Sequence, residues 1–327
     1  MILTRSPLRI SLGGGGTDLP SFYEKYGGYV VSAAIDKYIY VALTKPFSKG
    51  IYLKYSKIEK VFSVKDIEHK IFKEVLKKNK DINKQIELTT LADIPSGTGL
   101  GSSGSFTAAL LSSINAYKRI TMSKLELANK ACSIEIKNLK LPVGKQDQFT
   151  SVYGGINEYT FKPNGKVIVN NLGLSKIFLE NLRESSLMYF TGYSRSASKL
   201  LDVQKKYTIK NNKEMIENLK TVKSLGFETK KALLTEKISK YADILNYQWD
   251  LKKKRNLNSS NKKINEIYRY ALSNGALGGK LIGAGGGGFI YFLTEDKVFL
   301  RNKMKKIGLD EVHFNFDFEG TKNLIVD

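Results

Sequence analysis

Four closely spaced glycines between residues 91 and 113, in LADIPSGTGLGSSGSFTAALLSS, have the spacing of an anion-binding loop. They are Gly97, Gly99, Gly101 and Gly104, with hydroxyl side chains among them. Because glycine has no Cβ, the backbone can come close to a ligand and point successive N–H groups at it. A helix that begins directly after such a loop adds the positive end of its dipole. The stretch is therefore predicted to bind phosphate.

The residues around this loop predict the elements that hold it. Residues 86–91 are rich in strand formers, and Pro95 then interrupts regular structure. Beyond the glycines, Phe106, Leu110 and Ile114 recur at helical spacing. We expect a strand, a loop, and a helix that begins at the serine pair after the third glycine.

Three known phosphate-binding patterns fit the loop poorly. A Walker A loop needs a lysine after its last glycine, and none stands there. Gly99-x-Gly101-x-x-Gly104 matches the dinucleotide pattern, but an acidic strand end should follow about 20 residues later, where residues 123–126 look helical instead. The His-Arg-Asp and Asp-Phe-Gly tripeptides of protein kinases do not occur in the sequence.

The run Pro95-x-x-x-Gly99-Leu100-Gly101-Ser102-Ser103 instead resembles the central motif of the GHMP small-molecule kinases. The resemblance implies an ATP-dependent kinase that uses Mg²⁺. It also implies that the phosphates of ATP are bound by Pro95, Gly97, Gly99, Leu100, Gly101, Ser102, Ser103 and Gly104.

Two further stretches carry the same resemblance, in the order that the family shows. Pro7-x-Arg9, followed nine residues later by Asp18, resembles the first motif as galactokinases carry it. The glycine-rich run 283–288, which precedes a strand-like run at 289–293, resembles the third motif, which packs near the phosphates. By this resemblance the substrate would be bound by Gly14, Gly15, Gly16, Thr17, Asp18, Gly285 and Gly286.

One carboxylate is the candidate catalytic base. Residues 141–148, LPVGKQDQ, break a helix and place Asp147 between two amides, and an ordinary helix-capping Asp is the alternative. The stretch resembles the Gly-x-x-Asp-Gln segment in which sugar kinases of the family keep their catalytic aspartate. The resemblance places Arg9 near Asp147 and the γ-phosphate, and it makes Ser103 and Glu135 the ligands of Mg²⁺. For Glu135, a structural buried carboxylate is the alternative.

Within the family, RSPLRISLGGGGTDLP together with GKQDQ and TGYSRSAS is most similar to the branch that phosphorylates the anomeric hydroxyl of a heptose 7-phosphate. That branch supplies nucleotide-activated heptoses for capsule or lipopolysaccharide. Fucokinase-like and uronic-acid kinases are the alternatives. Galactokinases carry Glu and His where this chain has Gly15 and Gly16, which predicts room for an extra carbon and no carboxylate that would repel a phosphate. Arg195, in a Ser-rich segment, is expected either to bind that phosphate or to be a surface residue.

Composition limits the classes of function further. With 327 residues, 42% of them hydrophobic, the chain can bury a sizeable core and predicts about two domains. One cysteine excludes an internal disulfide framework, and the two isolated histidines argue against a zinc site. No long apolar segment is present, so we expect neither secretion nor membrane spanning, and we place the protein in the cytoplasm as a monomer or homodimer.

The formal charge of +22 invites comparison with nucleic-acid-binding proteins. The basic residues, however, are scattered through helical segments, and only residues 252–255 form a compact block. We interpret them as solvated lysine faces whose field attracts an anionic small substrate. The expected partner is therefore a small-molecule sugar phosphate and not a nucleic acid.

The predicted elements agree with the fold that the resemblance implies. Residues 2–12 and 29–63 predict strands, the latter in an antiparallel sheet, and Ser123 with Glu126 predicts a capping box at the start of a helix. The implied fold is α+β, with an N-terminal domain like the second domain of ribosomal protein S5 and a ferredoxin-like C-terminal domain. We divide the chain into residues 1–180 and 181–327, with the site between them. A Rossmann-type nucleotide-binding protein and an S5-like RNA-binding module are the alternatives of another class.

Overall fold

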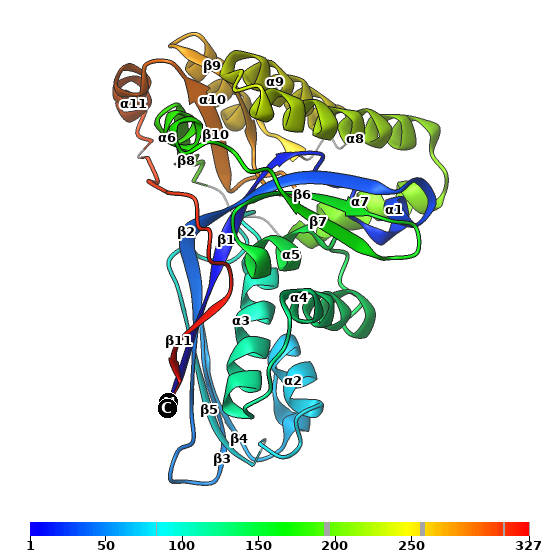
Figure 1. Cartoon of the computed structure of the whole chain (residues 1–327), viewed down its shortest axis with the longest axis vertical. Coiled ribbons are helices and arrows are strands. Elements are labelled where there is room, and N and C mark those ends of the chain that lie inside the picture. The colour runs from blue at the N-terminus through cyan, green and yellow to red at the C-terminus, as the bar shows by residue number, and fades with distance from the viewer. Residues whose placement is uncertain (83, 193–196, 256–258, 310, 327) are drawn as a thin grey trace.

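The computed structural model describes residues 1–82, 84–192, 197–255, 259–309 and 311–326. Figure 1 shows two bodies, one above the other: the lower is built on a large sheet, and the upper on a small sheet covered by helices. The strands of the large sheet are β1 (Ile2–Gly13), β2 (Gly28–Thr44), β3 (Gly50–Lys54), β4 (Ile58–Val61), β5 (Gln85–Ala92), β6 (Ile156–Phe161), β7 (Val167–Asn171) and β11 (Lys322–Val326).

Strand β2 is the spine of the large sheet, whose order is β11-β1-β2-β5-β3-β4. One edge of β2 pairs with β1 from Leu43, opposite Ile2, to Val31, opposite Gly13. Its other edge pairs first with β6 and then with β5, both antiparallel. The chain therefore brings the end of β1 and the start of β2 to the side that faces the upper body (Figure 1).

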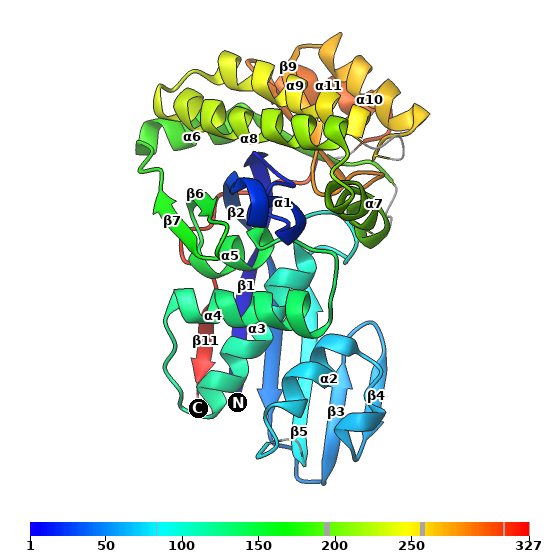
Figure 2. The same ribbon diagram turned by 90° about the vertical axis from the view of Figure 1, so that its right-hand side faces the viewer.

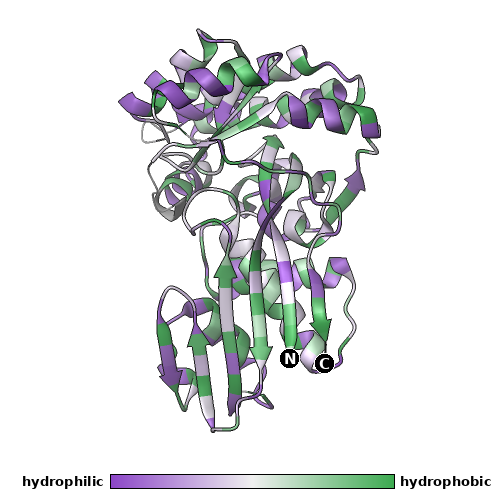
Figure 3. Cartoon of the chain, turned by 90° about the vertical axis from the view of Figure 1, so that its left-hand side faces the viewer, coloured by the Kyte–Doolittle hydropathy of each residue, from purple (hydrophilic) through white to green (hydrophobic). Residues whose placement is uncertain are grey.

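Helices cover one face of this sheet, while the upper body packs against the upper ends of β1 and β2. The covering helices are α2 (Lys70–Lys77), α3 (Ser102–Tyr117), α4 (Lys124–Cys132) and α5 (Gln146–Tyr153), with a π-helical segment, η2 (Ser133–Asn138), that continues α4. Figure 2 shows the helices in front of the strands, and Figure 3 shows the opposite side, where polar bands interrupt the apolar ones along the strands. This alternation follows from the two-residue period of side chains in a strand with one buried face.

The local signals in the sequence explain where these helices begin. Ser123 Oγ accepts a hydrogen bond from the Glu126 N–H at 3.2 Å, and Glu126 Oε2 accepts one from the Ser123 N–H at 2.9 Å. The predicted capping box is thus confirmed. Helix α3 begins at Ser102 after the glycine loop, as predicted, and it is buried on most sides because small residues such as Ser105 let it pack against β1.

The upper body contains a sheet of order β8-β10-β9, formed by β8 (Ser186–Phe190), β10 (Phe289–Thr294) and β9 (Ala276–Leu281). Its core includes Leu187, Trp249 and Phe292. The helices of this half are α6 (Lys176–Glu184), α7 (Ala197–Ile209), α8 (Lys213–Leu234), α9 (Ile238–Arg255), α10 (Lys262–Leu272) and α11 (Lys297–Lys306). A short helix, α1 (Pro20–Tyr26), and a 3-10 turn, η1 (Val64–Asp66), complete the described elements.

The strand pairing departs from the sequence expectation at one point. Strand β3 pairs antiparallel with β4, as expected for residues 29–63, but it also runs parallel to β5, with β4 and α2 forming the crossover between them. A parallel pair needs such a long connection, whereas antiparallel neighbours can be joined by a short turn. Strand β11 then returns from the upper body to pair with β1. The division of the chain at residue 180 stays a prediction. The last strand, β11, belongs to the large sheet although it lies beyond that division.

Within the described part of the chain, no helix has both the length and the apolar character that crossing a membrane requires.

Candidate active site

A cavity of about 710 Å³ is lined by residues of both bodies. Its walls come from β1 and the loop after it, the glycine loop before α3, the turn that leads into α5, the last turns of α9, and the end of β9. The three stretches whose residues predicted chemistry therefore meet around one space.

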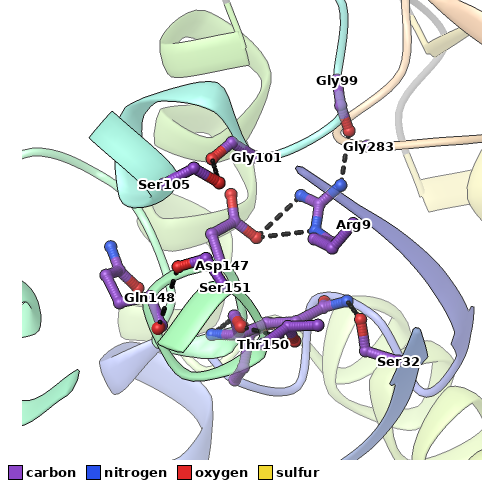
Figure 4. A network of polar contacts seen from close by, with 12 residues as sticks. Arg9, Ser32, Gly99, Gly101, Ser105, Asp147, Gln148, Thr150, Ser151 and Gly283 are labelled. Carbon is purple, nitrogen blue, oxygen red and sulfur yellow. Dashed lines mark hydrogen bonds and ion pairs between the residues drawn. The ribbon is translucent and has the colours of Figure 1, made fainter. Parts of the chain in front are cut away.

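An ion pair lies at the centre of this space. Arg9 on β1 donates from Nε to Oδ1 of Asp147, in the first turn of α5, at 2.8 Å, and its Nη2 lies 2.7 Å from the same oxygen. Arg9 Nη1 donates to the carbonyl of Gly99 at 2.6 Å (Figure 4). The Arg9 side chain is 8% exposed and that of Asp147 28%. Arg9 thus ties the carboxylate to the glycine loop and leaves part of it open to the cavity.

The glycine loop has a backbone conformation that residues other than glycine rarely adopt. Gly97, Gly99 and Gly101 have φ of 79°, 89° and 81°, and Gly101 is the N-cap of α3. A Cβ on Gly101 would lie 3.2 Å from Asp147 Cγ, so glycine here lets the loop lie against the carboxylate. The hydroxyl of Ser102 is buried and has no hydrogen-bond partner among the described residues. These donors fit the phosphates of a nucleotide at a helix N-terminus.

A second carboxylate lies behind the loop. Ser103 Oγ donates to Oε1 of Glu135, and Gln148 Nε2 donates to Oε2. Burial raises the pKa of Glu135 to about 7, against the lowering effect of these two hydrogen bonds. Glu135 lies in the π-helical segment η2, a local irregularity that often marks functional sites. Among the residues described, no group of three or more His, Cys, Asp or Glu side chains could hold a metal. The Ser103 hydroxyl and the Glu135 carboxylate are oxygen donors of the kind that Mg²⁺ prefers, so this pair fits that ion, which binds few protein ligands when phosphate oxygens complete its shell.

The loop after β1 contributes a third carboxylate. Asp18 is 5% exposed, and it accepts hydrogen bonds from the backbone N–H groups of Gly16, at 3.1 Å, and Gln146, at 3.0 Å. Burial raises the pKa of Asp18, the Gln146 N–H opposes this, and the nearby charge of Asp147 adds to it. Asp18 therefore joins the loop after β1 to the turn that carries Asp147.

Four of the described residues that line the cavity are cations, and only one of them is a site residue predicted from the sequence. Arg9 was expected there, whereas Lys252 and Arg255 belong to the block that we interpreted as a solvated face. That interpretation is wrong for these two side chains, because they turn into the cavity from the last turns of α9 while Lys254 is exposed. Lys280 on β9 is 5% exposed. Helical spacing in 251–255 could have indicated that 252 and 255 share a face.

The far end of the cavity, beside the glycine loop, is apolar and aromatic. Its walls include Ile39, Tyr55, His69, Ile71 and Phe106. The His69 ring packs edge-on against Phe106 at 5.3 Å between ring centroids, and burial lowers the pKa of His69. A flat heterocycle would find apolar contacts there. The sequence offered no motif for this pocket, since its residues come from four separate segments.

The predicted site residues are distributed unevenly around the cavity. The lining includes Arg9, Gly15, Gly16, Asp18, Pro95, Gly97, Gly99, Gly101, Ser102, Ser103 and Asp147. Glu135 lies one shell behind Ser103, and Arg195 lies outside the described residues.

Six predicted residues lie in packing positions that do not line the cavity. Leu100 is buried, and a Cβ on Gly104 would lie 2.7 Å from Asp147 Cβ, so both serve the packing around the carboxylate. The hydroxyl of Thr17 donates to the carbonyl of Gly14, which fixes the loop from behind. In the third motif the cavity is lined by Gly283 and Ala284, whereas Gly285 and Gly286 pack against Ser259.

Comparison with known proteins identifies relatives along the whole chain. The model of the GHMP kinases N terminal domain matches residues 66–155, and that of the GHMP kinases C terminal domain matches residues 229–307. The chain is 32% identical to D-glycero-alpha-D-manno-heptose 7-phosphate kinase of Campylobacter jejuni over 98% of each protein. It is 25% identical to L-fucokinase/L-fucose-1-P guanylyltransferase of Bacteroides fragilis over 89% of this chain and 34% of that protein.

A solved structure has the same two-domain arrangement. The crystal structure of a D-glycero-D-manno-heptose 1-phosphate kinase from Bacteroides thetaiotaomicron superimposes with a TM-score of 0.82, at 26% identity, over 100% of both chains. The mixed α+β architecture expected from the sequence is thereby confirmed.

Proposed function

Since this chain belongs to the GHMP kinase family and is an ATP-dependent phosphotransferase, we propose that it phosphorylates the anomeric hydroxyl of D-glycero-D-manno-heptose 7-phosphate. The product would be the 1,7-bisphosphate, an intermediate suited to the synthesis of nucleotide-activated heptose. The similarity to the Campylobacter jejuni enzyme supports the substrate class at 32% identity.

The observation that carries the proposal is the position of the Arg9–Asp147 pair. It lies between the glycine loop, through the Gly99 carbonyl, and the loop after β1, through the Asp18–Gln146 contact beside it. A sugar hydroxyl between these loops would meet Asp147 on one side and the terminal phosphate on the other. The geometry suits a general base and a phosphoryl donor that share one small space.

Mg²⁺·ATP would supply the phosphoryl group and neutralise charge on its oxygens. The N–H groups of the glycine loop and the N-terminus of α3 would hold the phosphates, and Ser103 with Glu135 would hold the metal. The pocket around Tyr55, His69 and Phe106 would take the purine.

The residues of the chain itself would orient the acceptor and move its proton. Asp147 would take the proton of the anomeric hydroxyl, while Arg9 fixes the direction of the carboxylate. An anomeric hydroxyl is more acidic than an ordinary alcohol, so an oriented carboxylate suffices as base. Asp18 would accept a hydrogen bond from a ring hydroxyl, and Gly15 with Gly16 leaves room for the longer sugar.

A substrate panel tests the proposal against the related activities. We expect release of ADP with D-glycero-D-manno-heptose 7-phosphate to exceed that with mannose, galactose, fucose and glucuronate by at least about 100-fold in kcat/KM. The similarity to a fucokinase makes fucose the informative competitor. Equal turnover of fucose or of a free hexose would overturn the heptose phosphate assignment and leave the kinase assignment intact.

A further inference from the structure

Among the described residues that line the cavity, the cations at its upper side outnumber the carboxylates that face them. Lys252, Arg255 and Lys280 join Arg9 there, against Asp18 and Asp147. Arg9 is already paired with Asp147. The two lysines bind neutral oxygens: Lys252 Nζ donates to the carbonyls of Leu281 and Gly283, and Lys280 Nζ to the Leu12 carbonyl and Gln248 Oε1.

This arrangement is electrostatically expensive without an anion. Burial, together with the charges of Arg9 and Arg255, lowers the pKa of Lys280 to about 7. Burial lowers the pKa of Lys252 well below its usual value, with the charge of Lys280 adding to the effect. Buried cations of like sign are stabilised by a bound anion that accepts their hydrogen bonds.

Arg255 has the geometry of an anion ligand. Its Nη1 is buried, and no residue that the structure describes accepts a hydrogen bond from that nitrogen. A Cβ on Gly16 would lie only 2.9 Å from Nη1, so the guanidinium lies against the loop that carries Asp18. Gln204 on α7 donates from Nε2 to the Gly16 carbonyl at 2.8 Å and thus borders the same point.

The position of Arg255 separates it from the nucleotide phosphates. The glycine loop packs against the third motif, since a Cβ on Gly99 would lie 2.9 Å from the carbonyl of Ile282. Lys252, bound to Leu281 and Gly283, is close to that junction. Arg255 instead lies against the loop after β1 at Gly16, on the side of Asp18. An anion held by Arg255 therefore belongs to the acceptor.

We propose that Arg255, supported by Lys280, binds the phosphate ester that the sugar substrate carries at the end remote from its reacting hydroxyl. This inference rests on the proposed function, and it gives the sugar substrate a second binding contact in addition to the one at its reacting hydroxyl. A phosphate dianion matches the excess of positive charge better than the single charge of a uronic-acid carboxylate does. Arginine presents two parallel N–H groups to such an oxyanion.

The variant Arg255→Gln tests this site in the full-length protein. We expect KM for heptose 7-phosphate to rise at least tenfold, because a charge-assisted hydrogen bond is lost. KM for ATP and the slow turnover of the unphosphorylated heptose should stay unchanged. Lys254→Gln is the matched control, because it removes one positive charge from an exposed position on the same helix. Arg255→Lys keeps the charge, so its KM for heptose 7-phosphate should lie between the values of wild type and Arg255→Gln. It is the test variant if Arg255→Gln does not fold.

Three outcomes decide the question. A selective loss for the phosphorylated sugar supports the site. An equal loss for phosphorylated and free heptose, or a change confined to ATP, overturns it while the proposed function stands. If wild type phosphorylates no sugar phosphate, the proposed function fails.

The anion site is then tested by the rise in Tm that inorganic phosphate causes. A rise in wild type and Lys254→Gln but not in Arg255→Gln supports the site, and equal rises in all three proteins overturn it.

Discussion

Arg9 binds Asp147 through only one of its two carboxylate oxygens. Both Nε, at 2.8 Å, and Nη2, at 2.7 Å, meet Oδ1, while Oδ2 accepts no hydrogen bond from any residue in the described ranges. The carboxylate is therefore fixed in direction, and its second oxygen remains available to a substrate hydroxyl. This division of the two oxygens is what a general base requires: one is held, and the other reacts.

The first prediction concerns this free oxygen. Asp147→Asn keeps an acceptor for Arg9 but removes the proton acceptor, so kcat should fall by about 100-fold or more. Binding of Mg²⁺·ATP, measured by calorimetry, should stay nearly intact. Asp243→Asn, on an exposed position of α9, is the control and should behave as wild type. Turnover above a tenth of the wild-type rate in Asp147→Asn would exclude Asp147 as the base.

The second prediction concerns the metal. Ser103 and Glu135 are hydrogen-bonded to each other, so each variant, Ser103→Ala and Glu135→Gln, removes one proposed oxygen ligand. Both should raise the Mg²⁺ concentration for half-maximal rate, by about tenfold or more for the loss of the carboxylate. Ser112→Ala in the same helix is the control, since its hydroxyl bonds Asn323, away from the site. Unchanged Mg²⁺ titrations for both variants would place the metal elsewhere.

The third prediction is a pH dependence of stability that arises from Glu135. Burial raises its pKa in the folded protein from the usual 4.5 to about 7. Between these values the folded state binds more protons than the unfolded state, so this group makes the free energy of unfolding fall as pH rises from about 5 to 7. Glu135→Gln removes the titrating group. In urea unfolding without nucleotide or metal, wild type should lose more stability than the variant between pH 5.5 and 7.5, and parallel profiles would contradict this origin.

The fourth prediction concerns the loop after β1. Gly15 lines the cavity, and a Cβ there would point toward Ser11 Oγ and Gln146 Oε1. Gly15→Glu should raise KM for the heptose phosphate by at least tenfold, because a carboxylate repels the phosphate. Gly15→Gln has nearly the same volume without the charge, so the difference between the two variants isolates electrostatics. An effect of Gly15→Glu on ATP alone would show that this loop does not face the sugar.

Sequence reasoning located the parts of the site that depend on contiguous residues. The strand, glycine loop and helix around Gly97–Ser103 were predictable because positive φ, helix capping and hydrophobic spacing act over a few residues. The contact of Arg9 with Asp147 spans 138 positions and came from family resemblance instead. No local pattern could supply the distance between them.

The cations of the upper side were beyond local reasoning. Lys252 and Arg255 looked like members of a basic block among 53 lysines and arginines, and only the packing of α9 against β9 turns them inward. Lys280 lies on a strand, and no pattern in the sequence around it indicates that it lines the cavity. The parallel pairing of β3 with β5 was missed for a related reason, since pairing direction is set by the crossover and not by strand composition.

The most direct test of the central claim is to identify the product of the reaction. The protein should be incubated with Mg²⁺·ATP and D-glycero-D-manno-heptose 7-phosphate, and ³¹P NMR should follow the phosphates. We predict ADP and a new phosphate resonance coupled to the anomeric proton, with the original 7-phosphate retained, and neither in Asp147→Asn over the same time. A new phosphate on any other hydroxyl, or ATP left intact while fucose or a free hexose is converted, would contradict the account.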